Sequence, residues 1–173
     1  MTDTPIPIVT LVTLMPSRVV MASKADFARQ LDKLIGKTAR TLRIFDFNAA
    51  ECGFGSAARE EQLAAFLRTS RRNRVFVAVH DLRYLETQAP RVQRLMKLFS
   101  HAFFVHQVNE DIRNVEDCLI VADDAHCIRK PHWERFNGVA LFDDPVGTRD
   151  WLNRFNAVWE QSRPGLSATT IGL

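Results

Sequence analysis

The chain has little of what would place it in a disulfide scaffold or a membrane. It contains three cysteines in 173 residues, an odd and small number that favours reduced thiols in a cytosolic protein. Its apolar N-terminal stretch is interrupted by Pro5, Pro7 and Pro16, so neither a signal peptide nor a membrane span fits. The sequence contains no internal repeat and no low-complexity tract. We therefore expect a cytoplasmic protein that does not contact a membrane.

A strong charge of either sign is also missing. The net charge is +3 and the pI is about 9.0, which permits contact with phosphates but falls short of a nucleic-acid-binding composition. Hydrophobic residues make up 46% and charged residues 25%, as in ordinary globular domains. At this length we expect one domain over residues 1–173, with an extended arm at 1–20 and a C-terminal tail at 163–173.

Hydrophobic spacing predicts alternating helices and strands over the first two thirds of the chain. Ser23, with Asp26 three residues later, has the pattern of a helix-capping box. The expected elements are a helix from Ser23 to Gly36, a strand from Thr41 to Phe47, a helix opened by Ser56, a strand from Arg74 to His80, a helix opened by Pro90 and a strand from Ala102 to Val108. This alternation is typical of parallel right-handed units.

The last third of the chain begins with a predicted β-hairpin over residues 113–129. We expect an apolar strand (Leu119 to Ala122), a two-residue turn (Asp123-Asp124) and a return strand. A loop at 130–137, a strand at 138–142 and a final helix opened by Pro145 follow. Together the elements predict an α/β fold with a mixed, mostly parallel sheet flanked by helices on both faces.

This order of elements, with the closing Gly138–Phe142 strand and the amphipathic helix after it, resembles one half of the phospholipase D superfamily. The resemblance covers roughly residues 23–162. Active members carry a His-x-Lys-x4-Asp motif, in which the imidazole attacks phosphorus and the ammonium neutralises the phosphate oxygens. Aligning the apolar strand places Glu116 at the histidine position, Cys118 at the lysine position and Asp123 at the aspartate position.

The two replacements imply a catalytically silent domain, because a carboxylate repels a phosphodiester and a thiol supplies no positive charge. The chain also resembles a poorly characterised bacterial family of degenerate phospholipase-D-like domains, some of them fused to N-acetyltransferase domains. Lys130-Pro131, Arg163-Pro164 and Gly172-Leu173 carry that resemblance. It implies no established activity. Because active members pair two halves across the motif face, a chain that supplies one half is expected to form a homodimer.

Polar residues at strand ends are the best-placed candidates for binding. Asp46 and Asn48 follow one predicted strand and His80-Asp81 ends its neighbour, where open α/β sheets place ligands. The alternative is that these residues only cap helices and turns. A second candidate is the basic and aromatic loop, which is typical of phosphate or single-strand binders and contains Arg129, Lys130, His132, Trp133 and Arg135.

No cofactor or metal is expected. The spacing of Cys118, His126, Cys127 and His132 matches no known zinc pattern. With Asp123-Asp124 as the turn, strand alternation places Cys118 and Cys127 on one face of the sheet and His126 on the other.

Three functions follow from these observations. The first is a non-catalytic binding or scaffold module that contacts another protein or a phosphate-containing ligand. The second is a hydrolase of altered chemistry, in which His80, His126 or His132 acts with Asp81 or Asp123. The third is a weak phosphate or nucleic-acid binder that uses the basic loop, although the charge makes nucleic acid an unfavoured partner.

Overall fold

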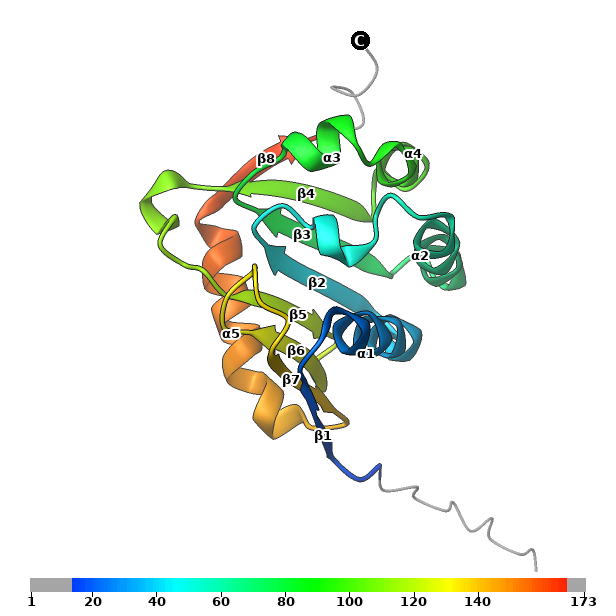
Figure 1. Ribbon diagram of the computed structural model, residues 1–173. Coiled ribbons are helices and arrows are strands. Elements are labelled where there is room, and N and C mark those ends of the chain that lie inside the picture. Colours follow the sequence, from blue (N-terminus) through cyan, green and yellow to red (C-terminus); the bar gives the residue numbers. More distant parts are fainter. Residues whose placement is uncertain (1–13, 168–173) are drawn as a thin grey trace, which may run out of the picture.

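A computed structural model describes residues 14–167, in which one mixed sheet separates two layers of helices (Figure 1). The strand order is β1 (Ser17–Met21), β7 (Gly138–Phe142), β6 (His126–Lys130), β5 (Cys118–Ala122), β2 (Thr41–Asp46), β3 (Arg74–Val79), β4 (Phe103–Val108) and β8 (Ser162–Leu166). One face is covered by α1 (Lys24–Lys37), α2 (Ala57–Thr69), α3 (Arg83–Thr87) and α4 (Pro90–Leu98), and the other by α5 (Pro145–Glu160). The α/β class with helices on both faces is therefore confirmed.

The expectation of a mostly parallel sheet is wrong. Among the described strands, β2–β3 and β3–β4 pair in parallel, and the other five neighbouring pairs are antiparallel. A parallel pair needs a long crossover that returns the chain to the edge where it started. After β4 the chain has only the short 3-10 helix η2 (Glu110–Ile112), so β5 starts at the edge where β4 ends. Strand β5 consequently runs antiparallel to β2.

The loop of the β5–β6 hairpin is one residue longer than the sequence analysis proposed. Ala122 pairs with His126, so residues 123–125 form a three-residue loop. The extra residue reverses the side-chain alternation of β6. Cys118 consequently packs under α1–α4, and Cys127 packs under α5. The expected placement of these two cysteines on one face is wrong.

Side-chain caps fix the starts of the three longest helices. The Ser23 hydroxyl accepts a hydrogen bond from the Asp26 backbone N–H, and the Ser56 hydroxyl accepts one from Arg59. At α5, the Asp144 carboxylate accepts a hydrogen bond from the Gly147 backbone N–H. Each cap satisfies an N–H that the first helical turn leaves without a partner.

The two edge strands overlap the segments that were expected to form an extended arm and a C-terminal tail. Residues 17–20 of the expected arm, together with Met21, form β1, and residues 1–13 lie outside the described part. Residues 163–166 of the expected tail, together with Ser162, form β8, and residues 168–173 lie outside the described part. Strand β8 contains Pro164, which an edge strand tolerates because its N–H side needs no partner. The pairing of β8 with β4 is irregular at Val105/His106.

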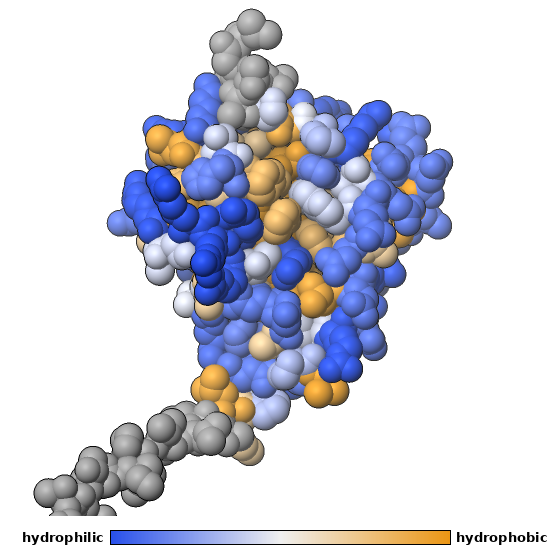
Figure 2. All heavy atoms as spheres, turned by 180° about the vertical axis from the view of Figure 1, so that it is seen from behind, coloured by the Kyte–Doolittle hydropathy of each residue, from blue (hydrophilic) through white to orange (hydrophobic). Residues whose placement is uncertain are grey.

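Apolar side chains fill the space between the sheet and both helical layers. The larger core lies under α1–α4 and the smaller one under α5. On the face seen from behind, apolar side chains form a strip between hydrophilic ones (Figure 2). No helix within residues 14–167 is long and apolar enough to cross a membrane.

Candidate functional site

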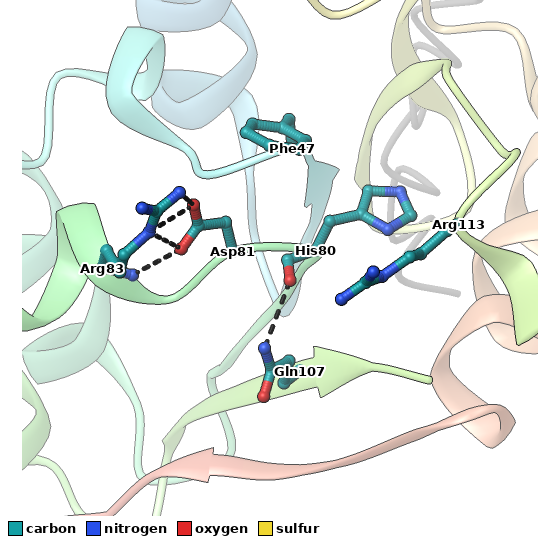
Figure 3. Close-up of a pocket in the computed structure, with 6 residues that line it drawn as sticks. All are labelled: Phe47, His80, Asp81, Arg83, Gln107 and Arg113. Carbon is teal, nitrogen blue, oxygen red and sulfur yellow. Dashed lines mark hydrogen bonds and ion pairs between the residues drawn. The ribbon is translucent and has the colours of Figure 1, made fainter. Parts of the chain in front are cut away.

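A cavity of about 440 Å³ opens where the parallel strands β2, β3 and β4 end. Figure 3 shows the side chains that line it: Phe47, His80, Asp81, Arg83, Gln107 and Arg113. Carboxyl ends of parallel strands meet at one edge of a sheet, and the turns there leave space for a ligand. We call this cavity the strand-end pocket.

Asp81 is held by Arg83. The Asp81 carboxylate accepts hydrogen bonds from Arg83 Nε at 2.8 Å and from the Arg83 backbone N–H at 2.9 Å. These contacts hold the pKa of Asp81 below its usual range. The carboxylate is therefore an ionised partner of Arg83, and it makes no hydrogen bond to the neighbouring His80 among those the structure describes.

His80 is fixed in one tautomer. Its Nε2 lies 2.9 Å from the Val115 carbonyl oxygen, and since a carbonyl can only accept, Nε2 carries the proton. The other ring nitrogen, Nδ1, is buried and has no hydrogen-bonding partner among the described residues. Burial lowers the pKa of His80, which favours the neutral ring. The ring also contacts Phe45 and Trp133, with centroid distances of 5.3 and 5.7 Å.

Two half-buried histidines and one buried histidine give the fold a pH dependence. Burial lowers the pKa values of His80, His106 and His126, so the unfolded chain takes up protons first as the pH falls. Stability is then lost below the unfolded pKa of about 6.5. Asp46, whose pKa is raised by burial, acts in the opposite sense. We expect a lower Tm at about pH 5.5 than at about pH 7.5.

Thermal unfolding of His106→Phe checks this expectation. Phenylalanine retains an aromatic ring to stack on Trp159, where the His106 centroid lies at 3.8 Å, and removes the titrating group. The variant should lose less stability than the native chain on acidification. An equal loss of stability in both proteins would contradict a contribution of His106 to the pH dependence.

Arg113 and Gln107 form the opposite wall of the strand-end pocket. Gln107 Nε2 donates a hydrogen bond to the His80 backbone carbonyl at 3.2 Å, which orients the amide. Arg113 extends into the space between His80 and Gln107 (Figure 3). Its partner Glu110, 2.8 Å away, is as exposed as Arg113 itself, and such surface ion pairs contribute little. The Arg113 guanidinium is therefore available to an anion in the pocket.

Of the motif positions, Glu116 lies two residues before strand β5 and Cys118 is the first residue of that strand. The Glu116 side chain is 56% exposed, and its carboxylate lies 3.5 Å from His132 Nε2. Cys118 has no exposed surface, and burial raises the pKa of its thiol well above the ordinary value. These two positions therefore present a solvated carboxylate and a buried neutral thiol.

Asp123 lies at the opposite end of β5, far along the strand from these positions. Its backbone has a φ of 52°, the left-handed conformation that aspartate tolerates in turns. Its carboxylate accepts hydrogen bonds from the backbone N–H groups of Ala39, Arg40 and Thr41 at 2.8–2.9 Å. Asp123 thus joins the hairpin to the start of β2.

Lys130 pairs with Cys118 across the hairpin, and its side chain is buried at 1% exposure. Its ammonium group donates a hydrogen bond to the Trp133 carbonyl at 2.9 Å and lies 4.6 Å from the Phe27 ring centroid. The positive charge of Lys130 also opposes the rise in the pKa of buried Asp46. This lysine is therefore part of the interior.

Asp46, Asn48 and Trp133 meet in a second cavity of about 530 Å³, on the other side of Phe47 from His80. Phe47 stacks on Trp133 at a centroid distance of 4.9 Å and lines both cavities. Asp46 and Asn48 accept hydrogen bonds from the backbone N–H groups of Ala49 and Ala50. Both side chains thus bind the backbone of the turn that leads into the short helix η1 (Ala50–Cys52).

The basic loop does not form one cluster. Arg129 lines a cavity beside Trp151 of α5, whereas Lys130 contacts Phe27 of α1 on the other face of the sheet. His132 contacts Glu116, and Arg135 is exposed. Within residues 14–167, no group of three His, Cys, Asp or Glu side chains could hold a metal ion.

Comparison with known proteins gives a family for the sequence and similar solved structures for the fold. A family model described as a domain of unknown function (DUF7931) matches residues 23–168. A search of curated proteins finds no match.

Similar solved structures include Nuc from Salmonella typhimurium, a phospholipase D family member (13% identity, TM-score 0.63, 88% of this chain and 100% of that chain). Others are TrmBL2, an archaeal chromatin protein that binds DNA (9%, 0.62, 95% and 57%), and phosphatidylserine synthase from Haemophilus influenzae Rd KW20 (15%, 0.58, 91% and 41%). The chain thus spans about half of the latter two and all of Nuc. At these identities the likeness shows the phospholipase-D-like fold.

Proposed function

The chain belongs to the DUF7931 family of domains of unknown function, and we propose that it is a non-catalytic module that binds a phosphate-containing ligand without cleaving it. The ligand would occupy the strand-end pocket, with its phosphate facing Arg113 and Gln107 and its remaining part against Phe47. Asp81 does not oppose an anion there, because Arg83 already neutralises it.

The proposal rests on the side chains that occupy positions 116 and 118. Phosphodiester cleavage by this fold needs a nucleophilic imidazole and an exposed ammonium on one face of the strand. Glu116 and Cys118 supply a carboxylate and a buried neutral thiol instead. Lys130, the nearest lysine across the hairpin, has its ammonium group in the core.

A hydrolase of altered chemistry is less well supported. It needs a histidine and a carboxylate within hydrogen-bonding reach of each other and of a substrate. Asp81 is engaged by Arg83, and Asp123 is engaged by backbone N–H groups at the opposite end of β5. His126 accepts a hydrogen bond from the Asp143 backbone N–H, also away from the strand-end pocket. His132 lies 3.5 Å from Glu116, and His126 Nδ1 lies 3.9 Å from the Asp143 carboxylate.

The proposed partners include a second copy of the chain. The chain spans all of Nuc but 41% of phosphatidylserine synthase, which is consistent with one half of a two-half arrangement. DNA is a further source of phosphate, because TrmBL2, the similar chromatin protein, binds DNA. The net charge of +3 makes small phosphorylated ligands the better fit.

Three measurements on the purified chain test the proposal. We expect no hydrolysis of bis-p-nitrophenyl phosphate, saturable binding of phenyl phosphate by calorimetry, and a dimer mass by light scattering. Arg113→Met should weaken phenyl phosphate binding at least tenfold, since a charge-assisted hydrogen bond contributes about 1.5–3 kcal/mol. Arg72→Met, at an exposed arginine in the turn between α2 and β3, is the matched control.

Hydrolysis that is lost in Glu116→Ala or in His132→Ala would refute the non-catalytic assignment. If Arg113→Met bound phenyl phosphate as tightly as the native chain does, the strand-end pocket would be refuted as the binding site. A DNA oligonucleotide that binds more tightly than phenyl phosphate, with an affinity that falls steeply with salt, would identify nucleic acid as the ligand instead of a small phosphorylated molecule.

A further inference from the structure

A separate cavity of about 220 Å³ lies on the α5 side of the sheet. It is lined by Arg18 of β1, Cys127 and Arg129 of β6, Val139 and Leu141 of β7, and Trp151 of α5. It shares no lining residue with the strand-end pocket. Helix α5 contacts β5, β2, β6 and β4 most extensively, so β7 and β1 are less covered on this face. The cavity lies where that cover ends, and we call it the α5-side cavity.

Within residues 14–167, Arg129 forms no ion pair with a carboxylate. Its guanidinium lies over the Trp151 ring, with 4.4 Å between Cζ and the ring centroid. Its Nε is buried and has no hydrogen-bonding partner among the described residues. By contrast, Arg83 and Arg154 each donate two hydrogen bonds to one carboxylate. A half-buried guanidinium loses hydration, and a missing anion leaves that loss uncompensated.

Arg18 adds a second positive charge at the same cavity. It pairs with Leu141 across the β1–β7 ladder, and Leu141 pairs with Cys127 on the next strand. The Arg18 side chain therefore lies two strands away from β6 on the same face as Cys127. Within residues 14–167, Arg18 makes no ion pair. The two arginines thus lie on either side of Leu141, and no acidic residue among those described lines the cavity to neutralise their charge.

The remaining walls are apolar. Val139 and Leu141 form the sheet side and the Trp151 ring forms the helix side. A small, strongly hydrated anion gains little from such walls, whereas an apolar group attached to the anion would bury surface against them. Stacking on Trp151 holds the guanidinium plane in place, which favours paired hydrogen bonds to two oxygens of one anionic group.

From the two unpaired arginines and the apolar walls, we infer that the α5-side cavity binds an organic anion, a carboxylate that carries a compact alkyl or aryl group. The carboxylate lies against Arg129 and Arg18, and the apolar group lies between Trp151, Val139 and Leu141. This site is independent of the strand-end pocket and of the proposed function.

Binding of 3-phenylpropionate to the full chain tests the inference, with its neutral amide and inorganic phosphate as competing probes. We expect saturable binding of the carboxylate, measured by calorimetry and by Trp fluorescence. The amide and phosphate should bind at least tenfold more weakly. Arg129→Met should weaken carboxylate binding at least tenfold, because it removes the fixed charged donors. Arg18→Met, at an exposed position, should weaken binding a few-fold.

Control variants separate this site from a loss of folding and from the strand-end pocket. Arg72→Met and Arg113→Met should bind 3-phenylpropionate as the native chain does. Arg129→Lys keeps the charge without the planar fork, so it should recover part of the affinity lost in Arg129→Met. Native-like circular dichroism is required of each variant. Equal binding of acid and amide, equal or tighter binding of phosphate, no saturable binding, or unchanged binding in Arg129→Met would each overturn the inference.

Discussion

Replacing Gly138 by alanine is expected to destabilise the fold by about 3 kcal/mol, at the upper end of overpacking costs. A Cβ at this position would lie 2.3 Å from the Arg129 carbonyl oxygen and 3.0 Å from Met21 Cε. The carbonyl belongs to the backbone of β6 and cannot swing aside like the end of a side chain. Relief requires β6 and β7 to separate where Gly138 also pairs with Met21 of β1. Urea unfolding measures the loss.

Gly36→Ala is the matched control for this substitution. Gly36 lies in α1, and an added Cβ meets no atom within 4 Å. Alanine should therefore stabilise the chain by about 0.5 kcal/mol through helix propensity. Similar effects of the two substitutions would contradict the close approach of β6 and β7.

The second large effect is expected for Asp123→Ala, with a loss of about 3 kcal/mol, since hydrogen bonds to a charged group contribute about 1.5–3 kcal/mol each and do not add fully. The substitution leaves three backbone N–H groups, of Ala39, Arg40 and Thr41, without their acceptor. It also places alanine at a φ of 52°, where a Cβ is disfavoured. Thermal and urea unfolding both report the loss.

Asp124→Ala tests whether the effect belongs to these bonds or to the charge of the hairpin loop. Asp124 is the next residue, and its carboxylate, 77% exposed, lies 3.9 Å from Arg43 Nη1. We expect a change below about 0.5 kcal/mol, as for most exposed ion pairs. A comparable loss in both variants would show that loop charge, rather than the three backbone contacts, matters. Asp123→Asn should fall between them because it keeps one acceptor oxygen.

Local signals in the sequence were sufficient for the four longest helices and for the central strands along the chain. Ser23 and Ser56 cap helices as predicted, because a cap depends on residues within one turn. The direction of the strands could not be predicted from such local signals. Whether β5 runs parallel or antiparallel to β2 depends on the absence of a crossover helix after β4, which periodicity within one strand does not report.

The candidate site was predicted in part. His80 and Asp81 do line the strand-end pocket, because strand ends can be read from an apolar run followed by polar residues. Arg83, Gln107 and Arg113 were missed. Gln107 is an ordinary strand residue in the sequence, and Arg113 enters the pocket only through the fold of the η2 loop. The basic loop was misjudged as one cluster, since Arg129 and Lys130 are consecutive strand residues and alternation sends them to opposite faces.

Strand β1 has a practical consequence for where the folding unit begins. The family match starts at residue 23, after β1 has ended at Met21, yet β1 pairs with β7 along five residues from Ser17 to Met21. A truncation at residue 23 would strip this strand from the sheet and leave the backbone groups of β7 open to pairing with other molecules, a known route to aggregation. The unit to express and crystallise therefore starts upstream of Ser17.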